Sequence, residues 1–364
     1  KAPELSRDFQ KKATSLSPAF VFPFREESIP VLEWAMQQEG SWKHQYYLGL
    51  IYWHKGRTDK ATEYFNQIGE ASDYAAFYIA RALLIEKKNP EMSAASLKKA
   101  WQLDAGEWRT WHYYQQHLLK KNQLEELQAI SYQAYKRFPQ NPVVGMNYAK
   151  ALTVVDRYDE ALNVLKKLQI LPQENAQEGH ELYEEVLLGQ AINRIKAKKY
   201  KEAIRLIDES RKWPENLGAG SPYEPDTRLQ DYLAAYCFEK MNRFAETEKL
   251  YERIAQYTLK HFPTHNKILN NHLGLQVLQK TGRNDQSLEW LNKWNTQLDS
   301  LYKWNILPAP SHDVQWILAK QQQKEHEATR LRQEMLFNRS NIWQRHFFDA
   351  IQFNESLQLP PANP

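Results

Sequence analysis

Apolar residues recur along this chain every three or four positions, the spacing that places them on one face of an α-helix. The clearest stretch combines apolar and small residues at Leu48, Gly49, Tyr52, Gly56, Ala61 and Phe65. This spacing predicts two helices joined by a turn at Gly56, with Gly49 allowing the second helix to approach closely. Weaker copies follow downstream: Ala161 lies 34 residues after Leu127, and Ala203 lies 42 residues after Ala161.

The copies divide most of the chain into helical hairpins. We expect eight of them, the last one diffuse, at residues 42–69, 73–104, 107–139, 142–172, 180–213, 227–258, 265–298 and 311–337. Residues 1–30 form a lead-in in which an extended apolar segment at 20–24 docks on the first hairpin. A helix is expected at about 29–38 and a capping helix at 341–353, before a frayed tail at 357–364 with three prolines.

This pattern resembles the tetratricopeptide repeat (TPR), a helix–turn–helix unit that stacks into a solenoid. The resemblance implies an all-α, right-handed α-solenoid of about seven or eight hairpins. Its domains would be an N-terminal docking segment with a first helix at 1–40, a TPR-like solenoid at 41–338, and a capping helix with its tail at 339–364. Repeats of this kind bind other molecules more often than they catalyse reactions.

Composition narrows the function further. The chain has 364 residues, 25% of them charged, with a net charge of +4 and no basic run typical of a nucleic-acid-binding surface. No stretch approaches the ~20 apolar residues of a membrane helix, and no signal peptide is visible. We therefore expect a cytoplasmic protein with neither nucleic-acid nor membrane partners, although Lys1 in place of Met indicates processing or a longer parent chain. The single Cys237 excludes an intramolecular disulfide and is expected in the core.

Three stretches carry a second resemblance: Phe22–Ser28, Trp108–His112, and 213–218 running on into 221–223. Together they resemble an uncharacterised bacterial family in which a β-sandwich domain related to galactose mutarotase precedes a TPR array. The likeness covers about residues 18–300. It implies that this chain is the C-terminal array of a larger protein, and that any carbohydrate activity belongs to the preceding domain.

The concave face of such an array is lined by the first helix of each hairpin. Projecting that face gives candidate groove residues Tyr46, Trp53, His54, Tyr74, Phe77, Arg81, Arg109, His112, Gln116, Tyr232 and Tyr236. Aromatic rings offer a large contact area at low entropic cost, so such a groove suits an extended peptide or stacked sugar rings. The alternative is that several of these rings are packed between helices.

The long insert at 213–226 is the candidate functional loop, with Asn216, Gly218 and Tyr223 as its candidate contact residues. The alternative is a structural loop that packs against a neighbouring hairpin. No metal site is expected, since Pro263 interrupts the helix that would align His261 with His265. No catalytic residue or cofactor is expected either, and the carboxylates of Glu181, Glu184 and Glu185 are expected on a solvated helix face.

Two functions are compatible with these features. The first is a non-catalytic scaffold that binds a protein or peptide through its concave aromatic and basic groove. The second is an accessory module of a larger carbohydrate-active protein, with that protein's own N-terminal domain as its partner and carbohydrate as an alternative ligand. Intrinsic enzymatic activity is a third and weaker alternative.

Overall fold

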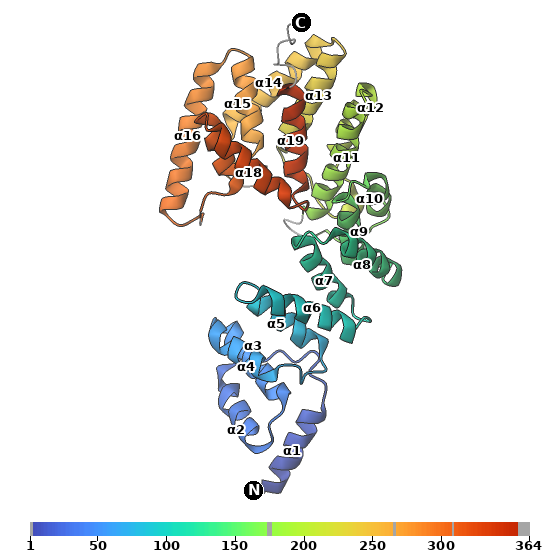
Figure 1. The fold of residues 1–364 in the computed structure, drawn as a ribbon, viewed down its shortest axis with the longest axis vertical. Helices are drawn as coiled ribbons and strands as arrows, with labels where there is room; N and C mark the ends of the chain where they lie inside the picture. Colours follow the sequence, from blue (N-terminus) through green and yellow to red (C-terminus); the bar gives the residue numbers. More distant parts are fainter. Residues whose placement is uncertain (1–2, 173–176, 265–266, 308, 356–364) are drawn as a thin grey trace. The chain divides into compact units, whose positions relative to one another are not determined.

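The structure is a computed structural model that describes residues 3–172, 177–264, 267–307 and 309–355. Its described part contains 19 α-helices and no β-strand, which confirms the predicted all-α solenoid class. The chain divides into two compact units, residues 1–118 and 119–364. Figure 1 shows that helices adjacent in sequence pack as pairs within each unit. None of the described helices has the length and apolar character required to span a membrane.

Unit 1 contains two lead-in helices followed by hairpins. Its helices are α1 (Pro3–Ser15), α2 (Ile29–Glu39), α3 (Trp42–His54), α4 (Thr58–Ile68), α5 (Ala75–Ile85), α6 (Pro90–Leu103) and most of α7 (Trp108–Lys120), with a short 3₁₀ helix, η1, at Glu26–Ser28. The pairs α3–α4 and α5–α6 form the two hairpins. Both coincide closely with the ranges expected from the apolar spacing.

Unit 2 continues the series. Its helices are α8 (Leu124–Arg137), α9 (Pro142–Thr153), α10 (Tyr158–Leu165), α11 (Glu178–Lys196), α12 (Tyr200–Ser210), α13 (Arg228–Lys240), α14 (Phe244–Lys260), α15 (Asn270–Lys280), α16 (Asn284–Lys303), α17 (His312–Gln321), α18 (Glu325–Phe337) and α19 (Ile342–Glu355), with a 3₁₀ helix, η2, at Glu215–Leu217. The eighth pair, which the sequence shows only diffusely, is a regular hairpin of α17 and α18.

One turn geometry recurs in six of the hairpins. A residue two or three positions after the first helix has a positive φ, between 58° and 76°, at Gly56, Asp156, Lys198, Asn242, Gly282 and Gln323. The next residue donates its backbone N–H to the carbonyl five positions earlier, as Arg57 does to Tyr52 and Arg283 does to Leu278, both at 2.8 Å. This is the Schellman ending of a helix. It satisfies carbonyls that the helix end leaves free and reverses the chain in the same way each time.

Small residues set the close approach of paired helices, as expected for Gly49. A Cβ on Gly49 would lie 2.2 Å from Cε1 of Phe65, and one on Gly189 would lie 2.3 Å from Cζ of Tyr158. The small residues that repeat near the start of the second helices are likewise buried, at Ala61, Ala161, Ala203, Thr247, Ser287 and Ala328. Van der Waals packing of helix against helix therefore fixes the repeat.

The core of unit 2 runs continuously from α11 to α19 and includes Trp290 and Trp294. Cys237 is fully buried within it, as expected, and burial raises the pKa of its thiol to about 12. The indole nitrogens of the two tryptophans donate to the carbonyls of His261 and Pro263 at 3.1 and 2.9 Å. These bonds hold the segment between α14 and α15 against α16.

The lead-in differs from the expectation because residues 3–15 form helix α1. Its apolar residues Leu5, Phe9 and Ala13 stand four apart on one face, but they are few among charged and polar residues, and a helix was not expected here. Lys43 Nζ donates to the carbonyls of Thr14 and Leu16, both at 2.6 Å, which ties the end of α1 to α3. The apolar segment that follows has no regular structure, and Phe20 and Phe22 are exposed. The expected tail at 357–364 lies outside the described residues.

Candidate functional site

The structure divides the candidate groove residues into buried and exposed sets. The buried ones are Tyr46, Phe77, Arg81, Tyr232 and Tyr236, each less than 9% exposed. Arg81 is held in place by hydrogen bonds to Ser96 Oγ and to the Gly69 carbonyl. Burial in the core explains these side chains without a ligand, in agreement with the alternative that they pack between helices.

The remaining groove candidates lie at or near the surface. His54, Arg109 and Gln116 are exposed, whereas Trp53, Tyr74 and His112 are half-buried. Five half-buried aromatic residues of unit 1 pack against one buried cluster that includes Tyr46, Phe65 and Phe77; we call these five the unit 1 aromatic surface: Trp42, Tyr47, Trp53, Tyr74 and Tyr113. All five belong to the first helices α3 and α7 or to the residue that precedes α5.

In unit 2 the first helices of two hairpins are covered by the C-terminal helix α19 of the same chain. Helix α19 packs against both α11 and α13 (Figure 1). Tyr236 of α13 stacks on Phe353 with ring centroids 5.4 Å apart, and Lys196 of α11 pairs with Asp349 at 3.0 Å. The helix expected to cap the end of the array thus lies on the faces of two earlier hairpins.

The start of α19 is tied to the turn between α9 and α10. Arg339 donates to Asp156 at 2.7 Å and to the Val154 carbonyl at 2.9 Å, and Arg345 also donates to Asp156. On α19 itself, His346 Nε2 lies 2.7 Å from the Glu185 carbonyl, so it donates to that oxygen. Burial lowers the pKa of His346 to about 4, and the ring is therefore neutral at pH 7.

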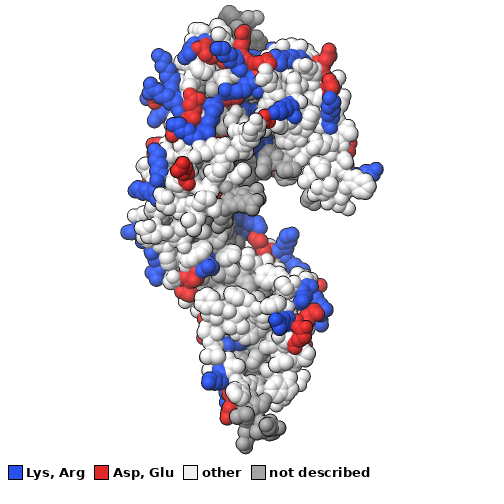
Figure 2. All heavy atoms as spheres, turned by 180° about the vertical axis from the view of Figure 1, so that it is seen from behind, with Lys and Arg blue, Asp and Glu red and all other residues white. Residues whose placement is uncertain are grey.

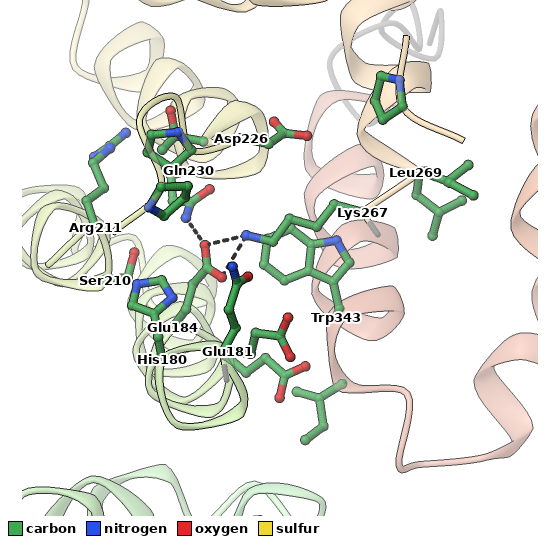
Figure 3. Close-up of a pocket in the computed structure, with 18 of the residues that line it drawn as sticks. His180, Glu181, Glu184, Ser210, Arg211, Asp226, Gln230, Lys267, Leu269 and Trp343 are labelled. Atoms are coloured by element: carbon green, nitrogen blue, oxygen red, sulfur yellow. Dashed lines mark hydrogen bonds and ion pairs between the residues drawn. The ribbon is translucent and has the colours of Figure 1, made fainter. Parts of the chain in front are cut away.

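A cavity of about 730 Å³ lies beside the first turn of α19 (Figure 3). Its wall is built by α11, the loop between α12 and α13, the segment after α14, and α19. Proline and aliphatic residues provide apolar wall at Pro222, Pro225, Pro263, Ile268, Leu269 and Ile342. Its volume is in the range of small-molecule and side-chain pockets. We call it the α19 pocket.

Glu184, which is buried, and Lys267, which is half-buried, form an ion pair in the wall of the α19 pocket. Lys267 Nζ donates to both carboxylate oxygens of Glu184, at 2.9 and 2.8 Å, and Gln230 Nε2 donates to the same carboxylate. Burial raises the pKa of Glu184, and the Lys267 ammonium opposes that shift. Lys267 Nζ also lies 4.3 Å from the centre of the Trp343 ring, a cation–π contact. Figure 3 shows Lys267 reaching over Trp343 toward Glu184.

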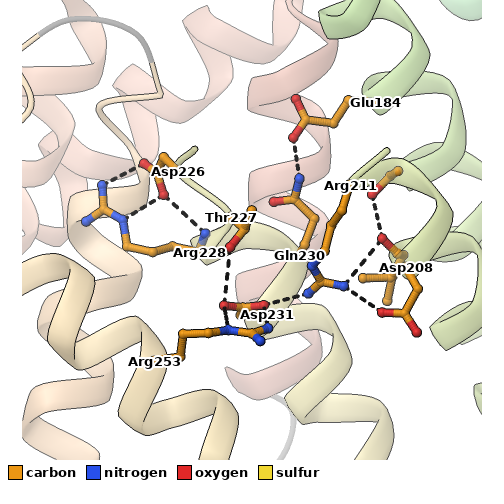
Figure 4. Close-up of polar contacts among 11 residues, drawn as sticks. Glu184, Asp208, Arg211, Asp226, Thr227, Arg228, Gln230, Asp231 and Arg253 are labelled. Atoms are coloured by element: carbon orange, nitrogen blue, oxygen red, sulfur yellow. Dashed lines mark hydrogen bonds and ion pairs between the residues drawn. The ribbon is translucent and has the colours of Figure 1, made fainter. Parts of the chain in front are cut away.

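Three further ion pairs, made by two buried aspartates, hold the loop that leads into α13 and the start of that helix (Figure 4). Arg228 is fully buried and forms a bidentate pair with Asp226, at 3.0 and 2.8 Å, and it also donates to Asn271 of α15. Asp231 is equally buried and accepts from Arg211 at 2.5 Å and from Arg253 at 2.7 Å. Charges buried this deeply need such partners, so these pairs fix the pocket wall.

His180 and Trp213 form a flat stack on another side of the pocket, with ring centroids 3.4 Å apart and an angle of 4°. Burial, assisted by the Lys267 ammonium, lowers the pKa of His180 to about 4. The imidazole is therefore neutral at pH 7. Its Nε2 is buried and has no hydrogen-bond partner among the described residues.

The candidate loop has two different halves. Asn216 donates from Nδ2 to the carbonyls of Leu165 and Leu168, at 3.0 and 2.9 Å, and Gly218 adopts φ +69° where a Cβ would lie 2.8 Å from the Ile170 carbonyl. These two residues pack the loop on the fourth hairpin, as in the structural alternative. Tyr223 is 98% exposed. The other residues of the later half, Pro222 and 224–227, line the α19 pocket.

Most of this pocket was not expected from the sequence. Glu184 is 2% exposed and Glu185 is half-buried, which corrects the expectation that their carboxylates lie on a solvated face, whereas Glu181 is exposed as expected. The sequence does contain a sign of this burial. Glu184 and Glu185 stand within a run of apolar residues from Leu182 to Leu188, and a helix that is apolar on several sides is usually buried. No group of described residues could hold a metal ion, and His265 lies outside them.

Comparisons with known proteins give only distant likenesses. No family model and no curated protein sequence matches this chain. Among solved structures, PilF of Pseudomonas aeruginosa is 16% identical with a TM-score of 0.38, covering 64% of this chain and 95% of its own. Naa15, in a structure of Naa15/Naa10 bound to HypK-THB, is 14% identical with a TM-score of 0.43, covering 99% and 58%. The TPR domain of P58(IPK) is 12% identical with a TM-score of 0.22, covering 98% and 99%. Because these TM-scores are low, fold and function are inferred from the chain's own residues and contacts.

Proposed function

We propose that this chain is a non-catalytic protein-interaction scaffold, and that the unit 1 aromatic surface binds a helical or extended segment of a partner protein. The observation that carries the proposal is the position of α19 in unit 2, where it packs against the first helices α11 and α13. First helices of this array thus accept a helix on their free side. The corresponding helices of unit 1 present half-buried aromatic side chains.

The chemistry of the two surfaces supports the same mode of binding. In unit 2 the contact combines an aromatic stack, Tyr236 on Phe353, with the ion pair of Lys196 and Asp349. In unit 1, Tyr47, Tyr74 and Tyr113 each combine an apolar ring with a hydroxyl, a combination that is enriched at protein interfaces. Burial raises the pKa of Tyr74, so its hydroxyl stays protonated and able to donate. An amphipathic helix or extended peptide presents the apolar anchors that such a surface takes.

The residue chemistry also favours binding over catalysis. Cys237 is buried with its pKa raised to about 12, which leaves no thiolate for nucleophilic attack at pH 7. In unit 2, Asp226 and Asp231 are each committed to arginine partners that hold the fold together. Figure 2 shows acidic and basic side chains interspersed over the face in view, as the net charge of +4 suggests. That distribution suits a protein partner better than the phosphate backbone of a nucleic acid.

A displayed library of random peptides tests the proposal directly. Enriched peptides should bind the purified chain, and Tyr47→Ala and Tyr74→Ala should each weaken binding at least about tenfold, because aromatic anchors dominate such interfaces. Tyr64→Ala is the matched control, since Tyr64 is a half-buried tyrosine on the second helix α4. Equal binding by all three variants, or a loss confined to Tyr64→Ala, would contradict the proposed surface.

The carbohydrate-accessory function predicts a different result in a parallel assay. A glycan that raises the melting temperature saturably, in the absence of any enriched peptide, would favour that alternative because a ligand of the native state stabilises it. In the α19 pocket one face of the Trp213 ring is already covered by His180, and Lys267 lies over Trp343. These contacts reduce the aromatic area left for stacking on a sugar.

A further inference from the structure

The α19 pocket contains more acid than its own cations neutralise. Six carboxylates line it, at Glu181, Glu184, Glu185, Glu224, Asp226 and Asp313, against two permanent cations, Arg211 and Lys267. Glu184, Glu224 and Asp226 have basic partners within 4.0 Å. The other three, Glu181, Glu185 and Asp313, form no ion pair with any described residue.

Two of these carboxyl groups have raised pKa values and form no ion pair with a described residue. Burial raises the pKa of Glu185 to about 8; the charge of Lys150 opposes this shift, and the neighbouring carboxylates of Glu184 and Glu181 add to it. Burial also raises the pKa of Asp313, whose Oδ1 accepts from Gln344 Nε2 at 2.6 Å. A cation bound in the pocket would supply the charge that both groups lack.

Two buried polar atoms of the pocket wall are also without partners among the described residues. They are His180 Nε2 and Gln230 Oε1, on side chains that are 4% and 1% exposed. Both are acceptors. Gln230 donates its amide nitrogen to the Glu184 carboxylate, so its Oε1 faces away from that bond without a donor. The neutral His180 ring forms a hydrogen bond with the backbone of Lys212, so the lone pair of its Nε2 stays free. Buried acceptors without donors are costly, so the wall is suited to a ligand that donates.

Lys267 already demonstrates which donor the pocket accommodates. Its ammonium is held by two oxygens of Glu184 and by the face of Trp343, while its side chain crosses the pocket wall. An ammonium group carries three donors and no acceptor. An alkyl chain attached to it would run along the apolar wall formed by Pro222, Pro263, Ile268 and Ile342.

We propose that the α19 pocket binds a second alkylammonium group, carried either by a free diamine or polyamine or by a lysine side chain of a protein. The ammonium meets the carboxyl groups of Glu185 and Asp313, where its charge favours their ionised form, and the free acceptors of Gln230 and His180. This site is separate from the unit 1 aromatic surface, and it goes beyond the scaffold function because it specifies a ligand chemistry. Its failure would leave the scaffold proposal intact.

Titration calorimetry on the full chain tests the site with four probes: 1,5-diaminopentane, spermidine, and Nα-acetyl-lysine-N-methylamide, with 1,5-pentanediol as the uncharged match of the diamine. We expect saturable heat from at least one ammonium compound and none from the diol. Binding by the free amines alone would identify a polyamine site. Binding by the lysine derivative alone would identify a site for a protein side chain.

Two variants connect the binding to this pocket. Glu185→Gln and Asp313→Asn keep the shape of each side chain and remove its charge, so each should weaken ammonium binding at least tenfold. Both should fold, because each replaces a half-buried carboxyl group that forms no ion pair with a described residue by an amide of the same shape. Glu289→Gln is the control, an exposed carboxylate of α16 that pairs with Lys293. Saturable heat that is unchanged in both pocket variants, or no heat from any ammonium compound, would overturn the proposal.

Discussion

Arg345 donates to the carboxylate of Asp156, 189 residues earlier in the chain. Arg339 donates to the same carboxylate at 2.7 Å. Burial alone would raise the pKa of Asp156, but the hydroxyl of Tyr158 and the two guanidinium groups outweigh that effect and lower it. One carboxylate at a hairpin turn therefore anchors the start of the helix that packs on α11 and α13.

Replacing this carboxylate should loosen α19. Asp156→Asn keeps a residue that tolerates the positive φ of 65° at this turn. It removes the charge that Arg345 and Arg339 contact, so we expect unfolding to become easier by about 1–2 kcal/mol, limited by the partial exposure of Asp156. Hydrogen exchange should rise in residues 342–353 before the rest of unit 2. Asp299→Asn, on the exposed side of α16, should leave both measurements unchanged, and equal protection of α19 in the two variants would count against this anchoring role.

A methyl group at Gly49 should disrupt the first hairpin. Its Cβ would lie 2.2 Å from the buried Phe65 ring, which cannot move away without shifting α4. We expect Gly49→Ala to lower the free energy of unfolding by about 1–3 kcal/mol, as overpacking of a core does. Gly220→Ala is the control, because its Cβ would meet nothing within 4 Å. Urea unfolding of the two variants measures the difference, and similar midpoints would show that α3 and α4 can separate at little cost.

Acid should destabilise unit 2 through buried histidines. Burial lowers the pKa of His346 from 6.5 in the unfolded chain to about 4 in the folded one. Between these values the unfolded chain binds more protons, so the stability is complete above pH 6.5 and falls as the pH drops toward 4. His346→Gln keeps a donor for the Glu185 carbonyl and should reduce this slope by up to about 1.4 kcal/mol per pH unit. Denaturant unfolding at pH 6.5, 5.5 and 4.5 gives the slope of the unfolding free energy against pH for the wild type and for the variant. Equal slopes would mean that the pKa of His346 is not lowered in the folded chain.

The loop between α12 and α13 should tolerate change in one half only. Asn216→Ala removes two hydrogen bonds to the end of the fourth hairpin, at Leu165 and Leu168, so we expect a loss of about 1–3 kcal/mol. Tyr223→Ala changes a side chain that is 98% exposed, and we expect an effect within about 0.5 kcal/mol. Thermal unfolding compares the two. A larger loss in the Tyr223 variant would show that the exposed tip, and not Asn216, stabilises the loop.

Most helices could be predicted from the sequence because each hairpin repeats the same local spacing of apolar and small residues. The expected hairpin at 142–172 contains α9 and α10, and small residues such as Ala161 and Ala203 are buried where the spacing places them. Helix α1 was missed because its apolar face is narrow, with Leu5, Phe9 and Ala13 among charged residues, and because it is tied to the fold through the lysine of another helix, Lys43. The tie becomes visible only once α1 and α3 are placed in space.

The α19 pocket could not be predicted because its parts are distant in sequence. Glu184 and Lys267 are 83 residues apart, and Trp343 belongs to a helix expected at the end of the stack. Nothing local to any of these residues indicates that they meet. The buried side chains of Tyr46 and Phe77 show a second limit: projecting one face of a helix does not distinguish a ring exposed in a groove from a ring packed in the core.

The position of α19 has a consequence for how unit 2 forms during synthesis. Repeat arrays usually need only contacts between neighbouring hairpins, so each can fold as it leaves the ribosome. Here the faces of α11 and α13 stay uncovered until the last described helix has been made, since α19 provides their contacts. Completion of unit 2 therefore depends on contacts of high sequence separation, a feature associated with slow folding. A ribosome stalled before residue 342 would present those faces to any other amphipathic helix in the cell.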